Sequence, residues 1–177
     1  IFIWLFCILL LTIVWNHTIM HKLWNHTMKG MTLLQELFDS ICKINCLNEE
    51  IESLYHQASV KLGVSDSVSF VLYMTYINKG KCLLYDIYKS SGISKQTINS
   101  AIRKLENEDI IYLEKYNGKS KIVCLTEKGK EYANQTAKKL YEAEFSAFKD
   151  WDEKEMEIYL KLMKKHRNSF KKQIEKL

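Results

Sequence analysis

The feature that most constrains the fold is a change of hydrophobic period in the middle of the chain. Apolar residues recur at steps of three and four up to Leu105, whereas the runs 111–115 and 121–125 partly alternate and are β-prone. These runs flank Asn117-Gly118, the strongest short signal for a β-hairpin. Helical period returns after Thr126, a good N-cap residue. The sequence therefore predicts a β-hairpin set between helices.

Composition favours helices in the rest of the chain. The 177 residues include no proline and six glycines, so long helices form easily and a many-turned β-sandwich is disfavoured. Hydrophobic periodicity and capping residues predict six helices, at about 33–60, at 66–76, at 83–92, at 94–108, from Thr126 to about Lys149, and from near Asp152 onward. In the first helix, residues 48–50 are either a solvated stretch or a break. The second helix has Ser65 or Asp66 as its N-cap.

The segment before the hairpin has the order of a helix-turn-helix. A short helical run ends at Gly92, Ser94 is placed to cap the next helix, and one face of that helix is apolar. The apolar positions follow the pattern i, i+3, i+4, i+7, at Ile98, Ala101, Ile102 and Leu105. The predicted fold class is mainly α (α+β): a winged helix-turn-helix core at 66–129, with dimerisation helices at about 33–60 and 130–177.

Positive charge is concentrated in the same region. Between Lys81 and Lys130 there are ten Lys and Arg against six Asp and Glu, a surplus of four (10 − 6) within a net charge of +5. A local surplus of this kind suits phosphate binding, although a solvated face without a partner gives the same pattern. The polar face of the helix at 94–108 carries no acid before Glu106. We expect double-stranded DNA as the partner.

Side-chain chemistry divides the candidate DNA contacts into two groups. A helix fits the major groove with its N-terminal residues at the base edges, where Asn and Gln pair with adenine and Lys with guanine. The candidate base contacts are Lys95, Gln96, Thr97 and Asn99. The candidate contacts to the DNA backbone, from the helix and the hairpin wing, are Ser94, Arg103, Lys104, Asn117, Lys119 and Lys121.

The run SGISKQTINSAIRKLENEDIIYLEKYNGKSKIVCLTEKG resembles the MarR family of bacterial regulators, and the resemblance extends over about 33–177. Leu125-Thr126-x-x-Gly129 matches the family's Leu-Thr-x-x-Gly after the wing. The family's Asp-x-Arg wing signature is replaced by Asn117 and Lys119, so a bidentate arginine is lost. The resemblance implies a triangular homodimer, a palindromic operator and usually repression. It also implies release of DNA by a small, often phenolic or lipophilic effector, or by thiol oxidation.

Cysteine usage indicates free thiols. The five cysteines include no CxxC pair, and no histidine or second pair completes a zinc site beside Cys42 and Cys46. Buried thiols in a reducing, cytoplasmic location are the expected state. The alternative is a redox sensor, for which the candidates are Cys42, Cys46 and Cys82.

The segment 1–30 is an apolar leader that does not suit the rest of the chain. Residues 1–15 are apolar apart from Thr12, shorter than the roughly 20 residues of a membrane span, and lack signal-peptide features. Trp-Asn-His-Thr occurs at 15–18 and again at 24–27, and each copy can be encoded by the dyad TGG-AA-CCA. One hypothesis is therefore that 1–30 is translated upstream operator DNA, with the start near Met28 or Met31 and autorepression as a consequence. The alternative is a short membrane anchor.

Two other classes of function fit the sequence less well than DNA binding. A winged helix can act as a protein-interaction module, but the basic surplus and the acid-free helix face favour DNA. Catalysis is not expected, since His56 and His166 have no evident nucleophile or carboxylate partner and glycine-rich phosphate loops are absent from the sequence. No cofactor and no metal are expected either.

Overall fold

The structure is a computed structural model that describes the backbone of residues 2–118 and 120–177, with side chains from residue 19 onward in those ranges. The chain divides into two compact units, residues 1–55 and 56–177. Helix α1, Phe2–Lys61, accounts for the first unit and ends in the second. Residues 48–50 continue this helix, so the solvated stretch is observed there and the alternative break is not.

The apolar side chains described in the first unit are not buried by other residues of that unit. All of its described side chains are exposed, including Leu34, Leu37 and Phe38. Burial of an amphipathic face supplies most of the stability of helices in proteins. The first unit therefore has an apolar face available for a partner. In the part of the chain that the structure describes, no helix has an apolar stretch long enough to cross a membrane.

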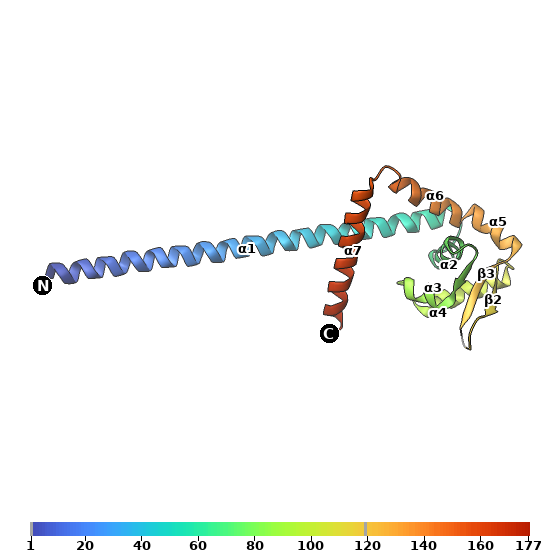
Figure 1. The fold of residues 1–177 in the computed structure, drawn as a ribbon, viewed down its shortest axis with the longest axis horizontal. Coiled ribbons are helices and arrows are strands. Elements are labelled where there is room, and N and C mark those ends of the chain that lie inside the picture. The colour runs from blue at the N-terminus through green and yellow to red at the C-terminus, as the bar shows by residue number, and fades with distance from the viewer. Residues whose placement is uncertain (1, 119) are drawn as a thin grey trace. The chain divides into compact units, whose positions relative to one another are not determined.

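The second unit has the order of a winged helix (Figure 1). After the end of α1, its elements are α2 (Asp66–Ile77), β1 (Lys81–Leu83), α3 (Leu84–Ser90), α4 (Lys95–Asn107), β2 (Ile111–Lys115), β3 (Lys121–Leu125), α5 (Glu127–Gln135), α6 (Ala137–Phe148) and α7 (Glu153–Ile174). The helix-turn-helix is α3 and α4, and β2 and β3 form the wing. The predicted fold class, mainly α (α+β) with a winged helix-turn-helix core, is confirmed.

Each predicted N-cap is made by the expected side chain. Ser65 accepts a hydrogen bond from the backbone N–H of Val68, and Ser94 and Thr126 cap α4 and α5 in the same way. At the predicted start of the last helix, Asp152 forms a full capping box. Its carboxylate accepts from the backbone N–H of Glu155, and the carboxylate of Glu155 accepts from the backbone N–H of Asp152. These bonds satisfy amide groups that have no partner within the helix, and so they fix where each helix begins.

The sheet is antiparallel with the strand order β1-β3-β2. Residue Gly118, at the hairpin tip, has φ +56°, a conformation that glycine adopts without strain. Strand β1 was missing from the sequence prediction, which placed 83 in the helix that follows. Its three residues carry no period of their own, and they become a strand because Lys81 to Leu83 pair with Ile122 to Cys124.

The core of this unit lies between α2, α4 and the sheet. Its most completely buried side chains, each under 2% exposed, are Leu72, Ile87, Ile98, Leu105, Val71, Val123, Thr75 and Cys124. All four apolar residues expected on the inner face of α4 are buried. Burial of a Leu or Ile side chain contributes roughly 1.5–3 kcal/mol, so this face anchors α4 to the rest of the unit.

The predicted continuous helix from Thr126 to about Lys149 is wrong. The chain bends at Thr136, where φ is −123° and ψ is −84°, and this bend separates α5 from α6. Thr136 is buried, and its hydroxyl donates to the carbonyl of Tyr132 at 2.8 Å. A threonine hydroxyl that bonds back to the previous turn favours a bend. After the bend α6 packs against α2.

The Leu-Thr-x-x-Gly segment closes the corner between the wing and α5. The Thr126 hydroxyl accepts from the N–H of Gly129 at 2.9 Å and donates to the carbonyl of Asp109 at 2.7 Å. A Cβ on Gly129 would lie 1.8 Å from the carbonyl oxygen of Ile110. Only glycine permits this approach, so residue 129 couples the start of β2 to the first turn of α5.

Replacing Gly129 with alanine is expected to lower the free energy of unfolding by about 2–4 kcal/mol, because the added methyl must displace backbone. Urea unfolding followed by circular dichroism measures the change. Gly92→Ala is the matched control, since a Cβ there meets nothing within 4 Å, and its change should stay within about 1 kcal/mol. Equal unfolding midpoints for the two variants would contradict this account of the corner.

Candidate nucleic-acid interface

Burial of the inner face of α4 determines which residues point outward. Ile98 and Leu105 are 0% exposed. The opposite face therefore presents its polar side chains to solvent, and the exposed ones are Lys95, Gln96, Thr97, Asn99, Ser100, Arg103 and Lys104. The packing therefore exposes the acid-free face of this helix that the sequence contains.

The N-terminal turn of α4 is held by two hydroxyl groups. The Ser94 hydroxyl accepts from the N–H of Thr97 at 3.1 Å, and the two hydroxyls are 2.9 Å apart and hydrogen-bonded. Ser94 is thus mainly a structural cap, and Thr97 shares its hydroxyl with that cap. The side chain of Gln96 makes no hydrogen bond to any residue in the described part of the chain, and so its amide is available to a ligand.

A tyrosine from α3 supports the same surface, and it was not among the residues predicted from the sequence to contribute to the site. Tyr88 is partly buried, and its hydroxyl donates to Oδ1 of Asn99 at 2.5 Å. The ammonium of Lys95 lies 5.8 Å from the centre of its ring, within cation–π range. Burial raises the pKa of Tyr88, against the opposing effect of the bond to Asn99. The spacing of Tyr88 in the sequence carries no signal for either contact.

The wing presents polar and basic groups at its tip. Lys115, Tyr116, Asn117 and Lys121 are exposed, and the turn is closed by a bond from the N–H of Tyr116 to the carbonyl of Ser120 at 3.0 Å. The predicted contact Lys119 lies outside the described residues. Tyr116, an exposed aromatic residue beside the tip, was not among the predicted contacts.

Part of the positive surplus is neutralised within the sheet. The ammonium of Lys81 lies 3.1 Å from Oε2 of Glu114. Their hydrogen bond lowers the pKa of Glu114 and raises the pKa of Lys81. Such exposed pairs contribute little to stability. The pair also removes one positive charge from the surplus of 81–130, and the other described basic groups there lie on α3, α4, the wing and α5.

The thiols differ in accessibility. Cys42 and Cys46 are exposed on α1, whereas Cys82 and Cys124 are buried. Burial raises the pKa of Cys82 to about 11, which disfavours the thiolate that oxidation requires. Burial also raises the pKa of Cys124, whose thiol donates to Glu114. Among the cysteines whose side chains the structure describes, the accessible thiols are therefore Cys42 and Cys46 of α1, outside the region expected to contact DNA.

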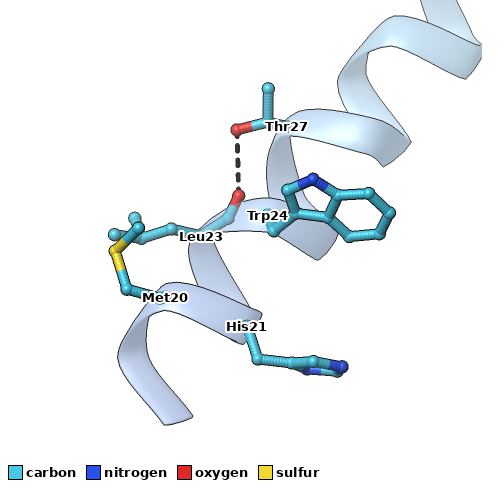
Figure 2. Close-up of a pocket in the computed structure, with 5 residues that line it drawn as sticks. All are labelled: Met20, His21, Leu23, Trp24 and Thr27. Carbon is cyan, nitrogen blue, oxygen red and sulfur yellow. Dashed lines mark hydrogen bonds between the residues drawn. The ribbon is translucent and has the colours of Figure 1, made fainter. Parts of the chain in front are cut away.

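Two shallow hollows occur away from α4. One is lined by Met20, His21, Leu23, Trp24 and Thr27 (Figure 2). All of its lining comes from two turns of α1, where the Thr27 hydroxyl donates to the carbonyl of Leu23 at 2.9 Å. The other is lined by Trp151 and residues of α7. Both are open spaces between side chains that are neighbours in the sequence.

Acidic and metal-binding side chains are dispersed over the described part of the chain. No cluster of three or more His, Cys, Asp or Glu side chains that could hold a metal ion occurs there. His56 does have a carboxylate partner, contrary to expectation, since Nδ1 lies 2.9 Å from Oδ2 of Asp66. Both side chains are more than half exposed, and the contact joins the end of α1 to the start of α2.

Comparisons with known proteins identify the fold. No family model matches the sequence, and no curated protein is significantly similar to it. Among solved structures, NMB1585, a MarR family regulator from Neisseria meningitidis, is similar with a TM-score of 0.67, 18% identity and coverage of 76% of this chain and 95% of that one. NadR in complex with 4-hydroxyphenylacetate has a TM-score of 0.56 at 11% identity, covering 69% and 87%.

A MarR family transcriptional regulator from Listeria monocytogenes, complexed with 26mer DNA, also has a TM-score of 0.56, at 20% identity and covering 73% of this chain and 87% of that one. The second unit, with part of α1, therefore has the winged-helix fold of the MarR regulators. The resemblance expected from the sequence is confirmed at the level of the fold.

The thiol of Cys82 is expected to react with N-ethylmaleimide at pH 7.5 at least about 100-fold more slowly in the folded chain than in denaturant, since burial removes both access and thiolate. Peptide mass spectrometry at timed intervals measures each site. Cys46, exposed on α1, is the internal comparison. Labelling of Cys82 at the same rate in the folded and unfolded chain would refute its burial.

Proposed function

We propose that the chain is a sequence-specific, DNA-binding transcriptional regulator. The observation that carries the proposal is the outer face of α4, which presents exposed donors and cations without an acid before Glu106, beside a basic wing. In a winged helix this is the surface that meets DNA. The solved structure of the Listeria monocytogenes regulator, which has the same fold, is a complex with DNA.

The geometry suggests a division of labour between the ends of α4. Lys95, Gln96 and Asn99 lie in its first two turns, where an inserted helix meets base edges. Arg103 and Lys104 lie two to three turns from the start, where the groove walls bring phosphates close to the helix. In the wing, Lys121 and Asn117 contact the DNA backbone, and Lys119 extends the same basic segment.

We propose that the chain binds a palindromic operator as a homodimer. The exposed apolar side chains of α1 support this, as do those of α7, in which no residue is buried. A second copy would cover such faces and place two α4 helices about one helical turn of DNA apart. Repression is the regulatory outcome that suits an operator overlapping a promoter, including an operator in the DNA upstream of Met31.

Control by an effector is part of the proposal. NadR, which has the same fold, was solved in complex with 4-hydroxyphenylacetate. This likeness supports a small aromatic ligand for this chain too. Oxidation is the other candidate signal, and the exposed thiols of Cys42 and Cys46, one helical turn apart, are its natural targets.

Sedimentation equilibrium of the full chain is expected to give twice the mass of one chain at micromolar concentration. Replacing Leu34 and Leu37 with glutamate is expected to weaken association, because two charges would enter an apolar interface. Lys43→Glu, a change at a charged position of the same helix, is the control. A monomer at all concentrations would overturn the proposed dimer.

Arg103→Ala is expected to weaken binding to every duplex by a similar factor and to reduce the slope of log affinity against log salt concentration by about 1, because one phosphate contact is lost. Fluorescence anisotropy with labelled duplexes at several salt concentrations measures both quantities. Lys164→Ala, which removes one charge from α7, is the matched control. An unchanged slope for Arg103→Ala would remove Arg103 from the interface, and a salt-independent wild type would contradict DNA binding itself.

A further inference from the structure

We propose that Tyr88 sets the base preference of Asn99, so that this asparagine selects guanine or thymine rather than adenine. The inference rests on the proposed DNA-binding function and specifies how one position of the operator is recognised. Tyr88 acts through another side chain, and so it is a positioning residue rather than a base contact.

The geometric basis is one hydrogen bond between the two helices of the helix-turn-helix. Tyr88 lies in the last turn and a half of α3, with its ring partly buried against the core. Its hydroxyl lies 2.5 Å from Oδ1 of Asn99, in the second turn of α4. Asn99 itself is exposed. The exposed amide of Asn99 is therefore held on its core-facing side by Tyr88, whose position is fixed by packing against the core.

The direction of this hydrogen bond decides what Asn99 offers to a ligand. A neutral phenol donates its proton, and burial raises the pKa of Tyr88, which keeps the proton in place at neutral pH. The acceptor is the amide oxygen of Asn99. Because the oxygen and the NH₂ group lie on opposite sides of the Cβ–Cγ axis within the amide plane, it is the NH₂ that faces away from Tyr88. Asn99 therefore presents a donor outward.

This orientation conflicts with the usual asparagine–adenine pair. That pair needs the amide oxygen to accept from adenine N6 while the NH₂ donates to N7. With its oxygen held by Tyr88, Asn99 meets adenine N6 with donor against donor. Guanine offers acceptors at both N7 and O6, and thymine offers O4, so these bases match the outward NH₂. For Asn99 the proposal therefore differs from the adenine contact that residue type alone predicts.

Lys95 gives the same preference one turn earlier. Its ammonium lies 5.8 Å from the centre of the Tyr88 ring, four residues before Asn99 on the same side of α4. An ammonium group is also a donor without an acceptor, and guanine O6 and N7 are its preferred major-groove partners. Tyr88 thus places two donor-only groups next to each other, which favours neighbouring acceptor-rich base edges.

Selection from a random duplex pool, with the full-length chain, tests the proposal. The base position read by Asn99 is the one at which Asn99→Ala flattens the wild-type preference. There the wild type is expected to prefer guanine or thymine. Tyr88→Phe keeps the ring beneath Lys95 and removes only the hydroxyl, so the amide can turn over and the ratio of adenine to guanine should rise about tenfold.

Two further variants separate positioning from simple loss of structure. Tyr85→Phe removes an exposed hydroxyl from the same helix and should leave the selected sequence unchanged. Asn99→Asp keeps an oxygen for the Tyr88 hydroxyl and presents a second oxygen outward, so its preference should move to cytosine or adenine, which carry amino donors. Asn99→Asp changes an exposed residue, so it tests the same geometry even if the Tyr88→Phe variant does not fold. Thermal melting of each variant shows whether it is folded.

The outcomes separate this inference from the proposed function. A wild type that enriches no sequence overturns both. A wild type that enriches a sequence supports DNA binding, and the inference then fails if Asn99→Ala flattens no position, if the wild type prefers adenine there, or if Tyr88→Phe folds and keeps the wild-type preference. In the Asn99→Ala background, Tyr88→Phe should have no effect on base preference, and a shift there would also overturn the role of Tyr88.

Discussion

Burial of one face of α4 is the constraint on which the rest of the functional surface depends. Ile98 and Leu105 are fully buried between α2 and the sheet, and Ala101 and Ile102 are nearly so. Because these side chains fix the rotation of α4 about its axis, every polar residue on its other side faces solvent. The same packing brings Tyr88 of α3 against Asn99. Both the direction and the chemistry of the candidate DNA-reading surface therefore follow from apolar contacts.

The wing is placed by a second, smaller constraint. The hydroxyl of Thr126 bonds to both α5 and the chain before β2, and Gly129 allows the carbonyl of Ile110 to approach where any side chain would collide. This corner connects the hairpin rigidly to α5. A wing fixed in this way can contact the DNA backbone at a constant distance from α4, which sequence-specific recognition requires.

Features with local causes could be predicted from the sequence, and features with tertiary causes could not. Ser94, Thr126 and Asp152 cap helices through bonds within three residues, and Asn117-Gly118 forms a turn by itself, so these signals were sufficient. Strand β1 exists only through pairing with β3, and the bend at Thr136 accompanies the packing of α6 on α2. Likewise, residue type made Asn99 a candidate base contact, but only the hydrogen bond from Tyr88 indicates which atom of its amide faces outward.

The most direct test of the central claim is dimethyl sulfate footprinting of the complex on a selected operator, because the reagent methylates guanine N7 in the major groove and adenine N3 in the minor groove. Insertion of α4 predicts protected guanine N7 atoms in two symmetric half-sites, about one helical turn apart. Methylation unchanged at guanine N7 throughout the bound site, or protection confined to adenine N3, would contradict the assignment of α4 as the DNA-reading helix.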